Sequence, residues 1–101
     1  EDEDTDIGFL NASQVAEEGV HKVVIIGGGP AGLSAATYAA RAGLKPLVVA
    51  PSFGGQLLGK GVDVENYPGV MGEHATGRGL VELMRRQAAS FEARFVDTAV
   101  L

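Results

Sequence analysis

The sequence predicts an α/β fold in which parallel strands alternate with helices. Two short runs of aliphatic residues, at 23–26 and 47–50, are apolar at every position, as expected of strands buried on both faces. A segment rich in helix formers, 30–42, lies between them, and three consecutive glycines join the first strand to this helix. Strand, helix and strand together have the length of a βαβ unit.

Length and composition limit what this unit can belong to. A chain of 101 residues has room for about one domain. Its 46% hydrophobic and 21% charged residues are ordinary for a globular protein and exclude disorder throughout. With 15 glycines and 6% aromatic residues, the interior is expected to contain small and β-branched side chains. The absence of cysteine excludes disulfides, thiolate metal ligands and thiol catalysis within these residues.

The net charge of −5 is concentrated at the start of the chain. Residues 1–18 hold seven of the 13 acidic residues and no Lys or Arg. We therefore predict an acidic N-terminal extension or linker over 1–20 and one partial domain over 21–101. The nearly neutral body lacks the basic face that nucleic acid requires. Because the chain begins with Glu1 rather than Met, we expect it to be trimmed, and a removed transit peptide, a removed preceding domain and a recombinant boundary would all look alike.

An uncharged stretch, 23–40, just reaches the length of a membrane span. Its three glycines, its proline and the Ala, Ser and Thr residues of its second half favour strand, turn and helix, so we expect no transmembrane segment. The chain also lacks the features of a secretory signal. We expect the protein to be located in a soluble, reducing compartment. Both the cytoplasm and an organelle interior such as the plastid stroma fit the sequence.

The predicted helix over 30–42 has clear boundaries. Pro30 falls in the first turn, where a helix tolerates proline, and Gly43 follows the last turn, where glycine commonly ends a helix. Alanines recur along one side of this helix, so it can lie close to the sheet. The second strand, 47–50, follows after a short turn.

The second half of the chain predicts a long loop, a helix and a third strand. Residues 51–72 are rich in glycine, and long loops of this kind in compact domains are often functional. Thr76 is the expected N-cap of a helix over 78–91. Its predicted apolar positions have helical spacing: Leu80, Leu83, Met84, Ala88 and Phe91. A loose alternation over 94–100 predicts the third strand.

Four polar residues in these elements are expected at the surface. His21 and His74 have no second ligand at metal-binding spacing. Arg85 and Arg86 lie on an amphipathic helix, where a solvated face is a better explanation than a phosphate contact.

The glycines after the first strand have a specific spacing. Gly27, Gly29 and Gly32 satisfy G-x-G-x-x-G between a predicted strand and a predicted helix, which is the dinucleotide-binding context of a Rossmann-like fold. The first glycine makes a tight turn, the second lets the backbone approach a pyrophosphate, and the third permits close packing of helix and strand. The amino end of the helix then faces the phosphates.

One expected feature of this fingerprint is missing. An acidic residue at the end of the second strand normally binds the ribose, but the sequence has Ala50 at about this position. We expect the ribose to contact the backbone of Pro51 and Ser52 or the Ser52 hydroxyl, or the affinity for an adenine dinucleotide to be reduced. The spacing alone does not distinguish FAD from NAD(P).

Three motifs are spaced along the chain: VVIIGGGPAGL at 23–33, GGQL at 54–57 and VENYPG at 64–69. Together they resemble the N-terminal FAD region of the low-molecular-weight thioredoxin reductases. The resemblance covers about residues 21–101, and the flavoprotein reductases of peroxiredoxin systems and the thioredoxin-reductase-like ferredoxin reductases share parts of it. The resemblance implies a Rossmann-like FAD-binding unit.

The resemblance also implies which residues bind FAD. The glycine turn and the start of the helix would hold the pyrophosphate, the two polar loop residues would approach the ribityl chain and flavin ring, and a backbone group of the third strand would meet the adenine. The implied cofactor-binding residues are Gly27, Gly28, Gly29, Pro30, Ala31, Gly32, Gly55, Gln56, Asn66 and Val100. The segment between Gln56 and Asn66 is one residue longer than expected of the family and contains Gly-Lys-Gly at 59–61, which affects the placement of Asn66.

In this family a hydride passes from NADPH to FAD, and the electrons then reach a Cys-x-x-Cys pair that reduces thioredoxin. The 101 residues contain no cysteine and no second glycine fingerprint. The resemblance therefore implies the FAD-binding segment of an NADPH-dependent disulfide oxidoreductase, catalytically incomplete in these residues, with NADPH and thioredoxin used only by a complete enzyme. The alternative is a noncatalytic structural or flavin-binding subunit docked in a larger complex.

The small size of the predicted sheet has the same consequence for the reductase segment and for the noncatalytic subunit. Two or three parallel strands with two helices leave an open edge and an apolar face, so the sheet is expected to be an incomplete version of a three-layer fold. We therefore expect a protein partner, or the remainder of a longer chain, to cover it.

Overall fold

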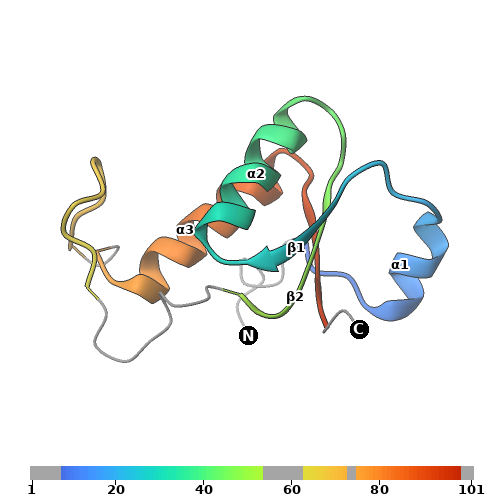
Figure 1. Cartoon of the computed structure of the whole chain (residues 1–101), viewed down its shortest axis with the longest axis horizontal. Helices are drawn as coiled ribbons and strands as arrows, with labels where there is room; N and C mark the ends of the chain where they lie inside the picture. Colours follow the sequence, from blue (N-terminus) through green and yellow to red (C-terminus); the bar gives the residue numbers. More distant parts are fainter. Residues whose placement is uncertain (1–7, 54–62, 73–74, 99–101) are drawn as a thin grey trace.

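The structure is a computed structural model that describes residues 8–53, 63–72 and 75–98 (Figure 1). Helices and strands alternate as predicted, and the α/β class is confirmed. The elements are α1 (Ala12–Glu18), β1 (Val24–Gly28), α2 (Pro30–Arg41), β2 (Leu47–Phe53), α3 (Gly77–Ser90) and β3 (Arg94–Asp97). The short helix α1 was not predicted, and β2 continues three residues beyond the predicted end. No helix in these ranges is long and apolar enough to cross a membrane.

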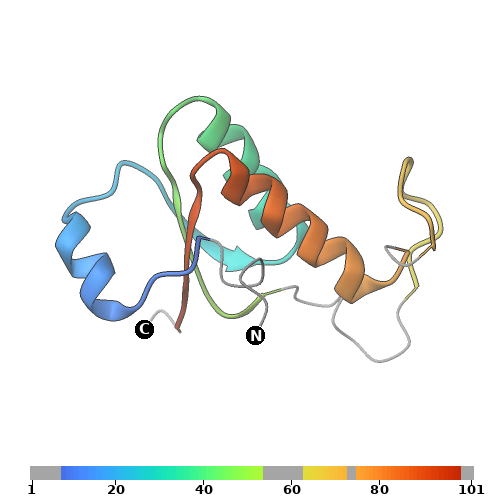
Figure 2. The same cartoon turned by 180° about the vertical axis from the view of Figure 1, so that it is seen from behind.

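The three strands form one parallel sheet in the order β1-β2-β3. The register places Ile25, Val48 and Phe95 side by side, so their side chains point to the same face of the sheet. Both long helices, α2 and α3, pack over this face, as the front and back views show (Figure 1, Figure 2). The β1-α2-β2 connection is the predicted βαβ unit.

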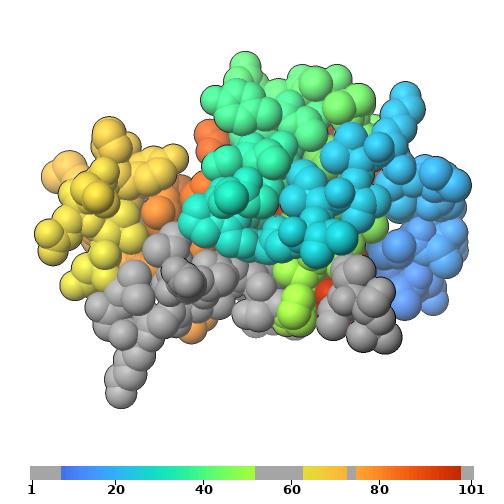
Figure 3. All heavy atoms as spheres, viewed as in Figure 1, coloured from blue at the N-terminus to red at the C-terminus, as the bar shows by residue number. Residues whose placement is uncertain are grey.

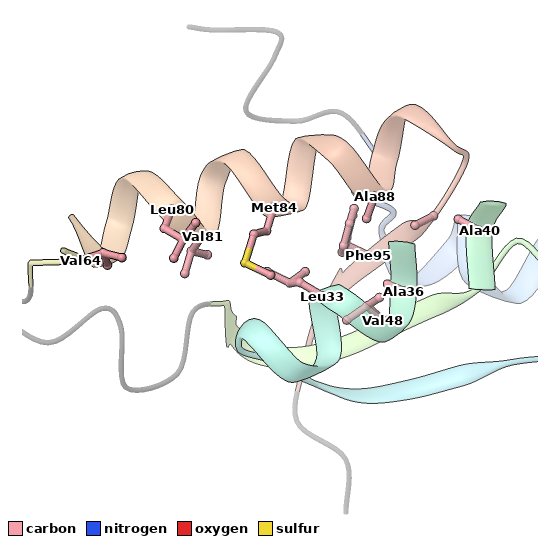
Figure 4. Packing of buried hydrophobic residues seen from close by; sticks show 11 residues of the cluster. Leu33, Ala36, Ala40, Val48, Val64, Leu80, Val81, Met84, Ala88 and Phe95 are labelled. Atoms are coloured by element: carbon pink, nitrogen blue, oxygen red, sulfur yellow. The ribbon is translucent and has the colours of Figure 1, made fainter. Parts of the chain in front are cut away.

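The core lies between the sheet and the two helices (Figure 4). Phe95, Leu33 and Val48 are its largest fully buried apolar side chains, and alanines of both helices fill the space around them. Of the apolar residues with helical spacing at 80–91, Leu83 and Phe91 are not in the core, because they are 39% and 42% exposed. Val81 is buried instead, because the helix turns Leu80, Val81 and Met84 toward the core.

The outer edge of β3 is paired with the chain just before α1. Phe9 forms a parallel bridge with Phe95. The Leu10 N–H donates to the Phe95 carbonyl over 2.7 Å, and the Phe95 N–H donates to the Gly8 carbonyl over 2.8 Å. The two phenyl rings lie with their centroids 5.5 Å apart. Part of the predicted acidic extension therefore satisfies backbone groups of β3. The β3 edge of the sheet is paired and is not an open edge.

The opposite edge of the sheet differs. Among the described residues β1 pairs only with β2, and its side chains Val24 and Ile26 are 51% and 68% exposed. Atoms of the segment around β1 form part of the molecular surface (Figure 3). The described residues thus leave these two apolar side chains of β1 largely exposed. The described part has a sheet layer and one helix layer rather than three layers.

Arg85 of α3 is buried, so the prediction of a solvated side chain is wrong for this residue. It is 2% exposed, and its guanidinium carbon lies 5.1 Å from the Phe9 ring centroid and 5.7 Å from that of Phe95. Its Nε and Nη2 donate to Glu82 over 3.1 and 2.8 Å. Phe9 comes from the segment that pairs with β3, and this contact could not be read from the helix. Arg86 is exposed, as predicted.

The buried aromatic ring of β3 gives a direct stability test. We expect Phe95→Ala to lower the free energy of unfolding by about 3–5 kcal/mol, because it removes the largest core side chain and leaves a cavity. Phe91→Ala is the matched control, since Phe91 is 42% exposed. Urea denaturation measures both variants, and equal losses would contradict the assignment of Phe95 to the core.

Glu82 gives a pH test. Burial raises the pKa of its carboxyl, but hydrogen bonds and positive charge from Arg85 and then Arg86 outweigh burial and hold the pKa below the ordinary value of 4.5. A lowered folded-state pKa stabilises the fold above the unfolded pKa, and this stability is lost as the pH falls through the lowered value. Glu82→Gln should therefore cost about 1–2 kcal/mol at pH 7, a modest value because the carboxylate is partly exposed.

The loss caused by Glu82→Gln should shrink as the pH falls below 4.5. Glu92→Gln is the control, because the Glu92–Lys45 pair is 3.9 Å apart with side chains 72% and 59% exposed. We expect its effect to be under about 0.5 kcal/mol at all pH values. A loss at Glu82 that did not change with pH in urea denaturation would contradict the assigned role of its charge.

Candidate functional site

The three glycines at 27–29 form the turn between the carboxyl end of β1 and the amino end of α2. Gly27 has a φ of +121°, a conformation that side-chain-bearing residues rarely adopt. The register with β2 shifts between Ile26 and Gly28, so β1 bends away just before the helix begins. The turn lies at the carboxyl edge of a parallel sheet, which is where open α/β sheets bind ligands.

Gly32 makes this turn sterically possible. A Cβ at position 32 would lie 2.1 Å from the carbonyl oxygen of Gly27 and 3.0 Å from its carbonyl carbon. Both are backbone atoms, so no rotamer change could relieve the clash. The close helix–strand packing predicted for the third glycine is therefore present.

The amino end of α2 has backbone donors with no partner inside the helix. Gly29 is the N-cap and makes no side-chain cap hydrogen bond, and Pro30 at the next position has no N–H. The Leu33 N–H donates to the Gly29 carbonyl over 2.9 Å, so the N–H groups of Ala31 and Gly32 precede the first helical bond and have no partner within the helix.

The other two described helices are capped. The Asn11 side chain accepts the Gln14 N–H over 2.9 Å at α1, and the Thr76 hydroxyl accepts the Gly79 N–H over 3.0 Å at α3. The start of α2 thus combines N–H groups that have no partner within the helix, the positive end of the helix dipole and a backbone without a side chain at Gly29. These features fit the pyrophosphate of a dinucleotide.

The end of β2 differs from the sequence-based expectation. Ala50 is 3% exposed, and its carbonyl accepts the Thr98 N–H over 2.9 Å. Because β2 continues to Phe53, Ala50 lies within the strand and not at its end. β2 itself contains no acidic residue, and the ribose contacts proposed for Pro51 and Ser52 stay predictions.

The other predicted cofactor residues are not brought to the turn by the described structure. Gly55, Gln56 and Val100 lie outside the described residues. Asn66 is exposed in the segment 63–72, which projects beyond the amino end of α3 (Figure 1, Figure 2). The Val64 N–H donates to the Ala75 carbonyl over 2.6 Å and ties this segment to the chain before α3. Residues 27–32 thus lie together at the start of α2. The cofactor-binding roles of all ten residues stay predictions.

The prediction that His21 lies at the surface is wrong. His21 is not a surface residue, because only 9% of its side chain is exposed, between Glu18 and Arg94. Its burial depends on α1, which has no strong pattern in the sequence. His74 lies outside the described residues. Within the described ranges, no group of three or more His, Cys, Asp or Glu side chains could hold a metal ion.

The family model for pyridine nucleotide-disulphide oxidoreductases matches residues 21–96. The chain belongs to this family. The match includes β1, the glycine turn, both long helices and nearly all of β3, so the site described above lies inside it.

Individual relatives point to thioredoxin reductases. The chain is 56% identical over 75 residues to a thioredoxin reductase of Mycolicibacterium smegmatis. The matched residues are 73% of this chain and 24% of the relative. It resembles the crystal structure of the atypical thioredoxin reductase TRi from Desulfovibrio vulgaris Hildenborough with a TM-score of 0.65 and 46% identity, covering 75% of this chain and 24% of that chain. These findings confirm the resemblance and the Rossmann-like fold.

A glucosaminate ammonia-lyase of Pseudomonas fluorescens is also 47% identical over 75 residues, covering 74% of this chain and 23% of the relative. The chain thus spans about a quarter of the length of the curated relatives it matches. Similarity over this segment is shared by proteins with different names and does not by itself fix a reaction.

The close approach at Gly32 predicts a position-specific effect. We expect Gly32→Ala to lower the free energy of unfolding by about 3 kcal/mol or more, because backbone must move. Gly43→Ala is the control: Gly43 has a φ of +79° but nothing within 4 Å of an added Cβ, so only backbone strain results. That strain costs about 1 kcal/mol. Thermal and urea unfolding measure the free energy of unfolding of both variants. A Gly32→Ala variant as stable as the Gly43→Ala variant would contradict the steric argument.

Proposed function

We propose that this chain is the FAD-binding segment of a thioredoxin-reductase-like, NADPH-dependent disulfide oxidoreductase. The observation that carries the proposal is the amino end of α2, which is uncapped and held tightly against the Gly27 carbonyl through Gly32. The family of the chain and the thioredoxin reductases among its relatives support the same cofactor.

The residues of the turn would bind and orient the pyrophosphate of FAD. The N–H groups of Ala31 and Gly32 would donate to phosphate oxygens, and the missing side chain at Gly29 lets those oxygens approach the backbone. The positive end of the α2 dipole adds attraction for the negative charge. Bound FAD would supply an isoalloxazine ring that accepts and returns a hydride. Gly55, Gln56, Asn66 and Val100 are the further contacts proposed from the resemblance.

The remaining steps of such a cycle need residues outside this segment. The 101 residues contain no cysteine and only one glycine fingerprint, so the nicotinamide site and the Cys-x-x-Cys pair would lie elsewhere in a complete protein. We propose NADPH and thioredoxin as reactants of that complete protein. In this view the uncovered side chains of β1, Val24 and Ile26, face the rest of the enzyme.

A second candidate function is a noncatalytic structural or flavin-binding subunit of a larger complex. The specific observation in its favour is the buried Ala50 in β2, with no described acidic residue for the ribose at the end of that strand. The exposed face of β1 would then dock onto a partner protein.

Two measurements on the protein purified from its native source separate these functions. An intact mass well above 10.4 kDa together with visible flavin absorbance supports the reductase. A mass that matches this chain with flavin absent contradicts the reductase and supports the structural subunit.

A charge variant at the turn tests the assigned flavin contact. Ala31 is exposed in the first turn of α2, so Ala31→Asp should preserve the helix while its carboxylate repels the pyrophosphate. In the complete protein we expect FAD affinity to fall at least about tenfold. Ala35→Asp, one turn further along and also exposed, is the matched control and should change affinity less than about threefold. Equal effects in flavin titrations would contradict binding at this turn.

A further inference from the structure

A second concave site lies at the amino ends of the strands, where no cofactor contact was assigned. Its volume is about 400 Å³, and three segments of the chain line it. The lining residues are Glu18, Val20, His21, Lys22, Gly43, Leu44, Lys45 and Arg94, which we call the amino-edge pocket. Because the strands are parallel, this pocket lies at the opposite edge of the sheet from the glycine turn. Figure 1 shows α1, which contributes Glu18, at that end of the sheet.

Two buried side-chain nitrogens of the amino-edge pocket have no hydrogen-bond partner among the described residues. The His21 side chain is 9% exposed, and its Nε2 is buried without a hydrogen-bond partner. Arg94 Nε, on the first residue of β3, is likewise buried and unpartnered. A buried polar group that makes no hydrogen bond is costly, and most such groups in native proteins have a partner. Two of them lining one pocket indicate an acceptor that binds there.

Glu18 engages the other ends of both side chains. Its Oε2 accepts from Arg94 Nη1 over 2.6 Å, and its Oε1 lies 3.8 Å from His21 Nδ1. The carboxylate thereby holds Arg94 from one side while leaving Nε unused. Arg94 Nε–H is a donor, and His21 Nε2 is also a donor when the ring carries a proton there as well as on the Nδ1 that faces Glu18. Both nitrogens then need an acceptor, which a cation or an apolar ligand cannot supply.

The charge of the pocket also favours an anion. Three cations, Lys22, Lys45 and Arg94, against one carboxylate, Glu18, give the lining a net charge of +2, whereas the chain carries −5. The partner of Lys45, Glu92, is 3.9 Å away and 72% exposed, so solvent screens that pair.

The carboxyl end of α2 borders the pocket, and free carbonyls there would repel an anion. They are partly satisfied, because the N–H groups of Gly43 and Leu44 donate to the carbonyls of Ala40 and Ala39 over 2.9 and 3.1 Å. The helix end therefore does not cancel the positive charge of the side chains.

We propose that the amino-edge pocket binds a phosphate group, either inorganic phosphate or the phosphate ester of a small molecule. His21 Nε2–H and Arg94 Nε–H donate to its oxygens, and Lys22 and Lys45 supply further positive charge. A phosphate dianion matches the net charge of the lining and has enough oxygens to accept from several segments at once, whereas a carboxylate has one charge and two oxygens. This site is separate from the proposed FAD contacts at 27–32.

Calorimetric titration of the complete natural protein with inorganic phosphate, at low ionic strength in a phosphate-free buffer, tests the proposal. We expect one saturable site per chain with a dissociation constant below about 1 mM. Arg94→Gln and Lys22→Gln should each weaken binding about tenfold, the effect of removing one charged contact. Arg78→Gln is the matched control, because Arg78 is exposed on α3 outside the pocket, and it should change binding less than about twofold.

Lys22 is exposed, so Lys22→Gln keeps the test valid if Arg94→Gln disturbs folding, which circular dichroism checks. A parallel titration with glycerol phosphate distinguishes the sources: tighter binding than inorganic phosphate identifies an ester, and weaker binding identifies the free ion. Absence of saturable binding up to about 10 mM phosphate overturns the proposal. So does binding that neither Arg94→Gln nor Lys22→Gln weakens, because the anion would then lie elsewhere.

Discussion

The contact between the Gly32 backbone and the carbonyl oxygen of Gly27 is the constraint on which the rest of this structure depends. The missing Cβ at position 32 lets α2 begin directly after β1 and pack against the strand it follows. That starting position turns Leu33 and Ala36 toward Val48, in the core cluster that α3 also joins. The same contact aims the amino end of α2 across the carboxyl edge of the sheet. Core packing and ligand binding are therefore consequences of one close approach.

The two edges of the sheet contain different chemistry. At the carboxyl edge the donors are backbone N–H groups on a rigid turn, which suits a pyrophosphate approached at close range. At the amino edge the donors are side chains, His21 and Arg94, supported by Glu18 of α1. The segment before α1 has a structural part as well, because Phe9 pairs with β3 and covers Arg85. The chain before β1 thus completes one edge of the sheet and lines a pocket at its amino end.

The βαβ unit, the glycine turn and the Thr76 cap could be predicted because each depends on neighbours in the sequence. The bridge of Phe9 to β3 could not, since it joins residues far apart and involves a segment too short to show alternation. The burial of Arg85 and His21 follows from this packing and was missed for the same reason. On α3, Val81 and Leu83 are similar in hydrophobicity, and only the position of α2 and the sheet decides which is buried. The absence of a side-chain cap on α2 could be anticipated from Gly29, but its free N–H groups required the structure.

The most direct test of the central claim is amide hydrogen exchange at Ala31 and Gly32 in the complete protein, measured by NMR with and without FAD. These two N–H groups have no partner within α2, so the account predicts rapid exchange without the cofactor and strong slowing when the pyrophosphate accepts from them. The N–H of Gly79, already bound by Thr76 in α3, should change little. Saturation with FAD that left exchange at Ala31 and Gly32 unaltered would contradict the claim that this turn holds the cofactor.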